Sequence, residues 1–390
     1  MTLSPSQDRV VRQLRQAGPL SRAALVDGTG LARATVVTAV GALLDAGLVT
    51  EQTRKPEGGR GSSLGRPPGV IALTRAAGLV AAIDLGKRHV RVAVADLSHE
   101  IVAERSRPTE PDLPAWQGIA LASELLDATL AEASAARADV LGVGVAVPGP
   151  LDEKTGQFGS STILPGWVGI NARQAFAEEL DLPVAVGNDG NLGALAEVAW
   201  GVAHGMSDFA YIKWATGIGC GLFARGGLVR GASGLAGEIG HVTVAGNDAF
   251  CRCGNRGCLD TVAGTQALLD AIAPALGDIT VDDLLERAQG GDVVCRRALA
   301  DAAAHLGAVL APLINIANPQ MIVIGGPVAR VADIVLPHLQ AAIGRACVPA
   351  AAADATLVAS GLGDRAELLG ALALVLGDEH LTVRGSRTVA

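Results

Sequence analysis

Residues 237–260, GEIGHVTVAGNDAFCRCGNRGCLD, hold one histidine and three cysteines in a short segment that contains several glycines. His241 comes ten residues before Cys251, and the cysteines follow the spacing C-x-C-x4-C. Thiolates and imidazole suit Zn²⁺, and four protein ligands make a closed structural site with no position for a catalytic water. Gly254 and Gly257 allow the loop to fold tightly around one ion. The segment therefore predicts a structural zinc site with the ligands His241, Cys251, Cys253 and Cys258.

Two carboxylates flank these ligands, Glu238 three residues before the histidine and Asp260 two residues after the last cysteine. If zinc takes one ring nitrogen of His241, the other carries the proton in a fixed direction. A fixed donor beside acceptors can bind the hydroxyl groups of a polyol. Spacing alone leaves a second interpretation open, in which both carboxylates are solvated loop charges. For the cysteines the alternative to zinc is three reduced surface thiols, which the glycine positions disfavour.

The composition predicts a globular protein of two or three domains, because 49% of the 390 residues are hydrophobic. Cys220, Cys295 and Cys347 are scattered, so no disulfide framework is apparent and we expect a reducing, cytoplasmic location. The first residues lack the apolar core of a secretion signal. The most apolar run, 306–326, contains two prolines and two asparagines. This pattern favours a helix, a turn and a strand over a membrane span, and we expect no membrane contact.

Charge is unevenly distributed along the chain. Residues 1–75 hold ten Lys/Arg and five Asp/Glu, a net charge of +5. The remaining 21 Lys/Arg and 34 Asp/Glu give −13, which accounts for the overall −8. A basic front end on an acidic protein indicates a nucleic-acid-binding module joined to a second unit.

The basic front end follows the order of a helix-turn-helix module. Apolar spacing predicts helices at 6–17, 21–26 and 32–46, with a glycine-containing turn at 28–30. A recognition helix presents its N-terminal residues to the major groove. Residues 53–73 place basic side chains among glycines and prolines between two strand-like pieces, as in a wing that contacts phosphates or the minor groove. The alternative is an interaction domain with an ordinary basic loop. Candidate DNA contacts are Arg33, Thr35, Thr38, Arg54, Lys55, Arg60 and Arg66.

After residue 75 the pattern changes to strands, glycine turns and helices. Residues 78–97 and 209–231 each predict two strands around a glycine-containing turn, and alternating strands and helices follow. This repetition indicates a two-lobed α/β domain. Ligands in such folds bind beyond the carboxyl ends of strands, where the glycine turns and the pair Asn188-Asp189 would gather.

Two features of this region point to phosphoryl transfer, each with a structural alternative. The turn 215–222, ATGIGCGL, offers backbone N–H groups without obstructing side chains, as phosphate-binding turns do. Tight glycine hairpins are also common without a ligand. Asp189 could accept a proton from a substrate hydroxyl. It could also be the N-cap of a helix that begins near Asn191, and both roles can hold at once.

Together these segments resemble the ROK family (repressor, open reading frame, kinase), which comprises sugar kinases and sugar-responsive transcription factors. The resemblance covers residues 78 to about 380, and the N-terminal winged helix matches the regulator branch. GEIGH with the cysteine loop is the most specific pair of motifs. The full set, in order, is DLG at 84–86, PGP at 148–150, NDGN at 188–191, ATGIGCG at 215–221, GEIGH at 237–241, CRCGNRGC at 251–258 and IGG at 324–326.

The resemblance implies an α/β protein in which an N-terminal winged helix-turn-helix precedes a two-lobed, actin-like, ribonuclease H-like ATPase (ROK) fold with a cleft between the lobes. The implied division is a DNA-binding domain at 1–75 and a ROK sugar-binding domain at 78–382. The smaller lobe would comprise 78–190 plus the C-terminal helix, and the larger lobe 191–362. Residues 383–390 would form a disordered tail.

The resemblance also implies roles for individual residues. Its sugar-binding positions are matched by Asn188, Asp189, Glu238, His241 and Asp260, and its zinc ligands by the four residues named above. Asp189 matches the catalytic base of the kinases. If the chain is a kinase, ATP and Mg²⁺ would be its cofactors, bound near Asp84, Gly86, Thr216, Gly217, Gly219 and Gly325.

Three positions depart from the family pattern. The kinases usually carry D-x-G-G-T-K at the first phosphate turn, whereas residues 84–89 read DLGKRH. Lys87 and Arg88 put bulky side chains where backbone must approach phosphate, although their positive charge could still attract ATP. Asp260 stands where a glutamate is usual and is shorter by one C–C bond, about 1.5 Å. Cys220 replaces the usual glycine or alanine, a mild change.

The sequence therefore favours a transcription factor that binds a double-stranded DNA operator through its winged helix and a sugar effector in its cleft. One alternative is an active, glucokinase-like ATP-dependent sugar kinase with a DNA-binding appendage. Another is a protein-interaction module on an inactive kinase scaffold. Two-fold operators usually require a two-fold protein, so we expect a homo-oligomer, either a dimer or a tetramer. The sequence does not identify the sugar, the operator or the sign of regulation.

Overall fold

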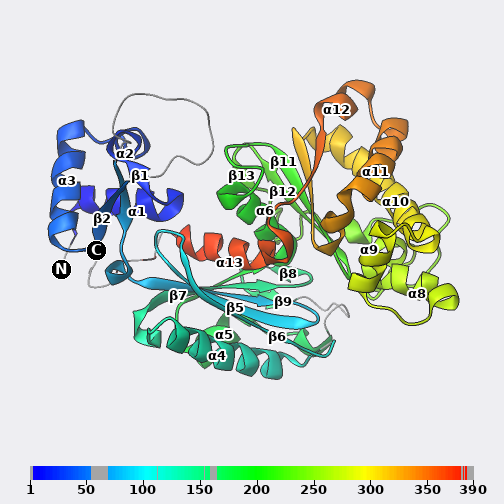
Figure 1. The fold of residues 1–390 in the computed structure, drawn as a ribbon, viewed down its shortest axis with the longest axis horizontal. Helices are drawn as coiled ribbons and strands as arrows, with labels where there is room; N and C mark the ends of the chain where they lie inside the picture. Colours follow the sequence, from blue (N-terminus) through cyan, green and yellow to red (C-terminus); the bar gives the residue numbers. More distant parts are fainter. Residues whose placement is uncertain are drawn as a thin grey trace.

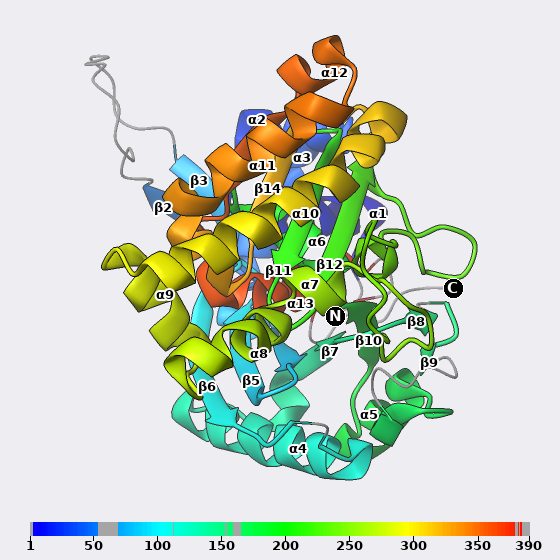
Figure 2. The ribbon, with the colours of Figure 1, turned by 90° about the vertical axis from the view of Figure 1, so that its right-hand side faces the viewer.

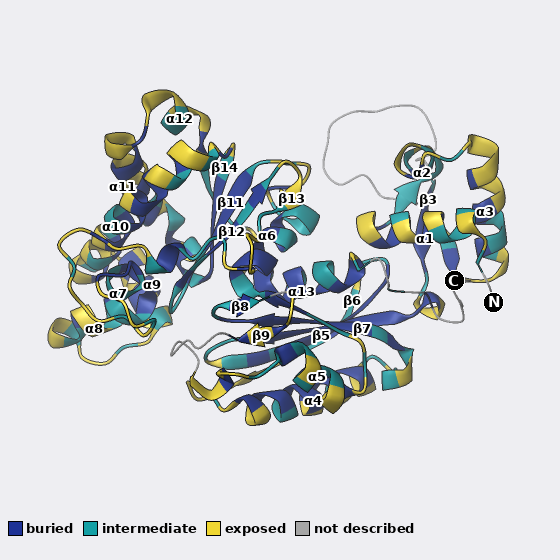
Figure 3. Ribbon diagram, turned by 180° about the vertical axis from the view of Figure 1, so that it is seen from behind, coloured by how far each residue is buried: buried dark blue, intermediate teal, exposed yellow. Residues whose placement is uncertain are grey.

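The computed structural model describes residues 3–53, 69–111, 113–152, 154–158, 165–378, 381 and 383. An N-terminal unit of three helices and a small sheet lies beside two larger sheets, each with its own helices (Figure 1). Figure 3 shows that the strands of both larger sheets are mostly buried.

The N-terminal unit has the predicted helix order, with α1 (Pro5–Ala17), α2 (Arg22–Thr29) and α3 (Arg33–Asp45). Ser4 and Ser21 cap the first two helices, since the side chain of each accepts a hydrogen bond from a first-turn backbone N–H. Three strands form an antiparallel sheet in the order β1-β3-β2, namely β1 (Leu20–Ser21), β2 (Val49–Thr53) and β3 (Gly69–Leu73). The predicted wing residues Arg54, Lys55, Arg60 and Arg66 lie outside the described residues.

The predicted end of the second helix was wrong. We expected a helix to residue 26 and a turn at 28–30, but α2 continues to Thr29. The Thr29 hydroxyl donates a hydrogen bond to the backbone oxygen of Leu25 one turn earlier, and Gly30 ends the helix in the left-handed conformation with φ of 63°. Gly28 is therefore a helical residue, which its low intrinsic propensity did not suggest.

The first large sheet has the strand order β10-β7-β4-β5-β6. Strands β4, β7 and β10 run parallel, and β5 and β6 continue from β4 as an antiparallel meander. Helices α4 and α5 cover one face and α13 covers the other (Figure 1). The strands are β4 (Leu79–Leu85), β5 (His89–Asp96), β6 (Ile101–Pro108), β7 (Val140–Val147) and β10 (Val184–Asn188), with a hairpin of β8 (Leu151–Asp152) and β9 (Gln157–Phe158); the helices are α4 (Ala115–Glu132), α5 (Ala172–Leu180) and α13 (Ala366–Leu376).

The second large sheet repeats this pattern in the order β13-β12-β11-β14-β15. Again an antiparallel meander is followed by two parallel strands, so each lobe has the same strand topology. Helix α6 (Asp189–Trp200) packs on the inner face. The strands are β11 (Phe209–Trp214), β12 (Ile218–Ala224), β13 (Gly227–Leu228), β14 (Met321–Gly325) and β15 (Thr356–Ala359); the other helices are α7 (Asp260–Ala263), α8 (Thr265–Leu276), α9 (Val281–Gln289), α10 (Val293–Ala317), α11 (Ala332–Ala346) and α12 (Pro349–Asp354).

Helix α10 is the single described helix long and apolar enough to span a membrane, although the bent pair α2 and α3 passes the same test if counted as one span. Half of the most apolar window of α10 is buried, and the helix lies along α11 on the second large sheet (Figure 2). This packing accounts for its apolar face. The predicted helix, turn and strand within 306–326 are confirmed, because α10 ends at Ala317 and β14 begins at Met321.

The N-terminal unit packs against the first large sheet and shares a continuous hydrophobic core with it and with α13. The buried guanidinium of Arg15 donates hydrogen bonds to the backbone oxygens of Leu381 and Asp378, the latter at 2.5 Å. Val383 is also buried, and residues 384–390 lie outside the described residues. Segments far apart in the sequence thus meet on one side of α1.

Helices α6 and α13 lie against each other between the two large sheets (Figure 1). The contact is close because Gly370 of α13 faces the backbone oxygen of Leu192 in α6, and a Cβ at position 370 would overlap that oxygen. Gly144 of β7 lies equally close to the backbone of Ala371 on the other side of α13. Glycine is therefore required where the helices and the sheet approach one another.

Replacing Gly370 by alanine should destabilise the protein, although alanine is the better helix former by about 1 kcal/mol. The added Cβ would force α6 and α13 apart, and overpacking of this kind costs about 1–3 kcal/mol. Thermal unfolding followed by circular dichroism would show a lower Tm. Gly344→Ala is the matched control, because Gly344 lies in α11 and no atom is within 4 Å of its Cβ position. The control should keep or raise the Tm, and equal effects of the two substitutions would contradict this packing.

Candidate functional site

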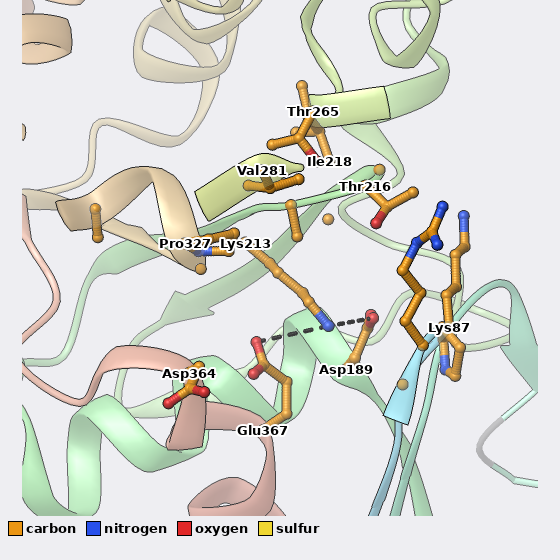
Figure 4. Close-up of a pocket in the computed structure, with 18 of the residues that line it drawn as sticks. Lys87, Asp189, Lys213, Thr216, Ile218, Thr265, Val281, Pro327, Asp364 and Glu367 are labelled. Atoms are coloured by element: carbon orange, nitrogen blue, oxygen red, sulfur yellow. Dashed lines mark hydrogen bonds and ion pairs between the residues drawn. The ribbon is translucent and has the colours of Figure 1, made fainter. Parts of the chain in front are cut away.

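A cavity of about 640 Å³ lies between the two lobes and is lined by residues from both. The β4–β5 turn and the start of α6 contribute to it, as do the β11–β12 turn, the segment 237–241 and the start of α13. Its volume is within the range of small-molecule sites. Figure 4 shows Lys87, Asp189, Thr216 and Glu367, which come from four of these elements, around the cavity.

The structure brings most of the predicted site residues to this cavity. All five predicted sugar-binding positions line it, namely Asn188, Asp189, Glu238, His241 and Asp260. Of the positions predicted for a nucleotide, Gly86, Thr216, Gly217 and Gly219 line it as well.

Two predicted nucleotide positions, Asp84 and Gly325, do not line the cavity. The Asp84 side chain is buried behind the first turn, and its Oδ2 lies 2.8 Å from His89 Nε2. Gly325 lies against the ring of Tyr211, which a Cβ would overlap. The sequence could not separate residues that reach the cavity from residues that support its walls.

Asn188 and Asp189 stand where β10 ends and α6 begins. Asn188 is the N-cap: its Oδ1 accepts from the backbone N–H of Gly190 at 2.9 Å and of Asn191 at 3.3 Å. Its amide Nδ2 donates to the backbone oxygen of Gly149 at 3.0 Å. The prediction that Asp189 could cap a helix starting near Asn191 was wrong, because the helix starts two residues earlier. Asp189 is instead the first residue of the helix, and its Oδ1 accepts from the backbone N–H of Gly190 at 2.8 Å.

Lys213 is a cavity residue that the sequence analysis missed. Its Nζ lies 2.8 Å from Asp189 Oδ2 and 3.8 Å from Glu367 Oε1, as Figure 4 shows. Burial alone would lower the pKa of Lys213, but the charges of Asp189, Glu367 and Asp84 outweigh it and hold the pKa above its ordinary value. One signal was available, a lysine within the otherwise apolar strand FAYIKW.

Glu367 is the second partner of Lys213 and lies near the start of α13. Its side chain is buried, and its Oε1 accepts a hydrogen bond from the Tyr211 hydroxyl at 3.2 Å. Burial raises the pKa of Glu367, while the charge of Lys213 acts in the opposite direction. The ammonium group is thus bracketed by carboxylates from two different helices.

The histidine and cysteines of segment 237–260 converge as predicted for a metal site. One ligand atom from each of the four residues lies within 4.8 Å of every other, and the residues are His241, Cys251, Cys253 and Cys258. Cys253 Sγ and Cys258 Sγ are 3.6 Å apart, and Cys251 Sγ is 3.6 Å from His241 Nδ1. Tetrahedral zinc with Zn–S bonds of about 2.3 Å separates its sulfurs by about 3.8 Å. The donor set therefore fits a single tetrahedral ion.

Glycines set the shape of the loop that carries these ligands. Gly257 has φ of 76°, and a Cβ there would lie 2.5 Å from the backbone oxygen of Asn247. Gly237 has φ of 94° and lies directly against the backbone oxygen of Cys220 in β12. Both positions combine a left-handed backbone with a close approach, which only glycine accommodates without strain.

Glu238 and Asp260 both line the cavity and are half-buried there. Glu238 Oε2 is 3.7 Å from His241 Nε2, the ring nitrogen that faces away from the cysteines. Burial, together with the charges of Asp189 and Asp260, raises the pKa of Glu238 to about 7. Asp260 Oδ1 accepts from the backbone N–H of Ile218 at 2.7 Å, which ties the metal-binding segment to the β11–β12 turn. The group offers hydrogen-bond donors and acceptors at fixed positions.

The β4–β5 turn brings positive charge to the opposite wall. Lys87 and Arg88 both line the cavity, and the charge of Lys87 acts on Asp260 across it. Arg88 Nη2 donates to Gln266 Oε1 at 3.3 Å and so bridges the lobes. The first turn thus places two cationic side chains on this wall of the cavity.

Comparisons with known proteins cover nearly the whole chain. The sequence model of the ROK family matches residues 80–378. The "Xylose repressor" of Caldicellulosiruptor bescii is 29% identical over 374 residues, which are 92% of either chain. The "Glucokinase" of Halalkalibacterium halodurans is 30% identical over 322 residues, covering 78% of this chain and 97% of its own. A match over 92% of the chain must extend beyond residues 80–378 into the N-terminal unit.

Among solved structures, a ROK family transcriptional regulator described as a homologue of the Escherichia coli Mlc protein superposes with a TM-score of 0.74 and 25% identity. The match covers 95% of this chain and 96% of that one. The predicted fold class is confirmed by this likeness and by the repeated topology of the two large sheets. The chain belongs to the ROK family.

Proposed function

We propose that this protein is a sugar-responsive transcriptional regulator of the ROK family. The observation that carries the proposal is a helix-turn-helix unit, packed directly on a domain whose cleft is lined by hydrogen-bonding groups. Relatives named as repressors match both parts of the chain. A sugar that binds one arrangement of the lobes better than another would change the position of the N-terminal unit, and hence the affinity for DNA.

The DNA-binding surface is proposed to be the N-terminal half of α3. Arg33, Thr35 and Thr38 are exposed there, while Val36 and Val40 turn into the core. The Thr38 hydroxyl donates to the backbone oxygen of Ala34 at 3.0 Å, which leaves its methyl group and the lone pairs of its oxygen for a base contact. An arginine at the start of a recognition helix can contact a guanine or a phosphate. We also assign phosphate contacts to the wing residues Arg54, Lys55, Arg60 and Arg66.

The sugar site is proposed to be the cavity wall formed by the start of α6 and segment 237–260. Its hydrogen-bonding groups are Asn188, Asp189, Glu238, His241 and Asp260. We propose Zn²⁺ as the metal held by His241 and the three cysteines of the loop. When bound, the ion would supply no chemistry, because four protein ligands leave no open position. Its effect would be to fix the His241 ring so that Nε2–H points toward the cavity.

An ATP-dependent sugar kinase is the second candidate. Asp189 lies at a strand end beside the glycine turn of β11–β12, which is where a base would stand for phosphoryl transfer. The glucokinase relative favours this reading. The regulator is the better-supported function, since Lys87 and Arg88 occupy the first turn and Lys213 already pairs with Asp189.

The regulator is proposed to act as a homo-oligomer, a dimer or a tetramer, because a two-fold operator is read by a two-fold protein. Each copy would present one α3 helix to one half-site.

A gel-shift series of genomic fragments with candidate sugars tests the function. We expect binding of discrete fragments with Kd of about 10⁻⁸–10⁻¹¹ M, and one sugar should change that affinity by about 5- to 150-fold. Asp189→Asn should keep operator binding and lose most of the sugar response. Arg33→Ala should weaken operator binding at every sugar level. Absence of sequence-specific binding at all sugar levels would refute the regulator, and turnover with Mg-ATP and a hexose that Asp189→Asn abolishes would establish the kinase.

Elemental analysis of the purified protein tests the metal. We expect about one zinc per chain, and Cys253→Ser should lose it, because three remaining ligands bind zinc much more weakly. The Tm should fall and sugar affinity should drop, since His241 would no longer be fixed. Cys347→Ser is the control: this cysteine lies far from the loop in sequence and its Sγ donates to Asn315 Oδ1 at 3.0 Å. Full sugar affinity in metal-free protein would contradict the proposed role of the ion.

A further inference from the structure

We propose that Lys213 is a resident cation of the cleft, which occupies the centre of a carboxylate cluster and excludes divalent metal ions from it. The cluster consists of Asp189, Glu367 and Asp84. The sugar then binds without a metal ion and without a nucleotide. This inference rests on the proposed sugar site. It assigns to Lys213 the selection of a sugar alone over a sugar with a metal ion and a nucleotide.

The geometry centres on the ammonium group. Lys213 extends from β11 of the second sheet, and its side chain is 16% exposed. Its Nζ lies 2.8 Å from Asp189 Oδ2 and 3.8 Å from Glu367 Oε1 (Figure 4). Asp84 acts on it by charge, while its own Oδ2 is held by His89. Helices α6 and α13 thus each direct a carboxylate at the ammonium group, and Asp84 adds negative charge nearby without a direct contact.

Charge balance explains why a cation must stand there. Without a positive partner, the buried Asp84 and Glu367 and the partly buried Asp189 would repel one another after losing hydration. Lysine compensates them from within the chain, and the cluster keeps the ammonium charged because the pKa of Lys213 is raised. A divalent cation entering the cluster would have to approach this ammonium at little more than contact distance. Like charges at that distance in a partly buried site repel strongly.

The ion pair also limits whether the Asp189 carboxylate can bind a sugar hydroxyl or remove its proton. Its Oδ1 accepts from the backbone N–H of Gly190 at 2.8 Å, and its Oδ2 accepts from Lys213. A carboxylate has about four lone-pair sites, so Asp189 can still accept a hydrogen bond from a sugar hydroxyl. Removal of the proton from that hydroxyl by Asp189 is disfavoured, because a protonated Asp189 would lose its ion pair with Lys213. Lys213 therefore favours binding of the sugar over activation of its hydroxyl.

Manganese binding to the zinc-loaded, full-length protein tests this inference. Mn²⁺ titrations followed by electron paramagnetic resonance should show no cleft site in the natural protein at millimolar Mn²⁺. Lys213→Met removes the charge and nearly preserves the length of the side chain, so it should bind Mn²⁺ at least tenfold more tightly. Lys213→Arg should exclude the ion as the natural protein does. Lys154→Met is the control, since Lys154 lies outside the cluster and its Nζ donates to the backbone oxygen of Ala232.

The outcomes separate this inference from the proposed function. Equal Mn²⁺ binding by the natural protein and Lys213→Met would overturn it, as would sugar binding that requires Mg²⁺ in dialysed protein. Neither measurement uses DNA, so failure of operator binding would leave the inference standing. If Lys213→Met does not fold, the double variant Lys213→Met/Glu367→Gln removes one charge of each sign. That variant should bind Mn²⁺ more tightly than Lys213→Arg, and equal binding would overturn the inference.

A second inference follows from a different observation: we infer that α6 and α13 connect the cleft to the N-terminal unit. Asp189 is the first residue of α6, and Glu367 is the second residue of α13. The C-terminal end of α6 contacts Arg15 of α1 through His99, and the segment just beyond the C-terminal end of α13 accepts hydrogen bonds from Arg15. The twelve residues of α6 span about 18 Å. This route also rests on the proposed function, whose regulation it describes.

The connection through α6 uses one ring contact and one hydrogen bond. Trp200, the last residue of α6, packs edge-on against His99, with ring centroids 5.3 Å apart. His99 Nε2 lies 2.6 Å from the backbone oxygen of Arg15, to which it donates. Burial lowers the pKa of His99, which keeps the ring neutral with a defined donor. The His99 backbone has φ of 72°, in the left-handed region.

The connection through α13 reaches the same residue from the other side. The Arg15 guanidinium donates to the backbone oxygens of Asp378 and Leu381, just beyond the end of α13. The two helices are themselves in close contact at Gly370 and Leu192. A movement of α6 would therefore displace the backbone of Arg15, and a movement of α13 would displace its side chain. Packed elements of this kind can carry coupling between two sites, and coupling is established by measurement.

The ratio of operator Kd with and without the effective sugar measures the coupling. Trp200→Ala should keep sugar affinity and sugar-free operator affinity within about threefold and reduce this ratio toward one. Trp116→Ala is the matched control, because Trp116 is 71% exposed on α4 and should leave the ratio unchanged. A full ratio in Trp200→Ala would overturn the inference alone. A natural protein whose operator binding responds to no sugar would refute the proposed function instead.

Discussion

The cleft depends on one partly buried ion pair, that between the Lys213 ammonium and the Asp189 carboxylate. Asp189 begins α6 and Glu367 lies at the start of α13, so the lysine fixes the starts of two helices relative to the second sheet. Burial makes the arrangement sensitive to loss of either partner, since an unpaired charge would remain in a poorly hydrated site. The same interaction therefore organises the packing of the lobes and the chemistry of the cavity.

Segment 237–260, which carries His241 and the three converging cysteines, extends this order to the opposite wall. Asp260 accepts from the backbone of Ile218, and Gly237 lies against the backbone of Cys220. The segment is thus joined to the β11–β12 turn at two points, and the position of His241 follows from both. Loop residues that would otherwise move independently of the sheet become part of a rigid wall. Hydrogen-bonding groups in fixed positions are what discrimination between similar polyols requires.

The sequence predicted the parts of the structure that local patterns determine. The helix order of the N-terminal unit and the four metal-ligand positions follow from spacing within short segments. The sequence did not predict a role for Lys213, because its partners Asp189 and Glu367 lie 24 and 154 residues away and local sequence patterns do not indicate such distant contacts. The N-cap is Asn188 and not Asp189, because α6 begins two residues earlier than the sequence predicted and the side chains of both residues can accept first-turn N–H groups. Asp84 and Gly325 show that a motif residue can support a wall without reaching the cavity.

The hydrogen bonds from Arg15 to Asp378 and Leu381 join the front of the chain to its far end. The three N-terminal helices contact one another locally, but their place on the rest of the molecule depends on backbone oxygens 363 and 366 residues further along the chain. A substitution that shifts the backbone at 378–381 would therefore reorient the N-terminal unit without altering any residue of its own helices.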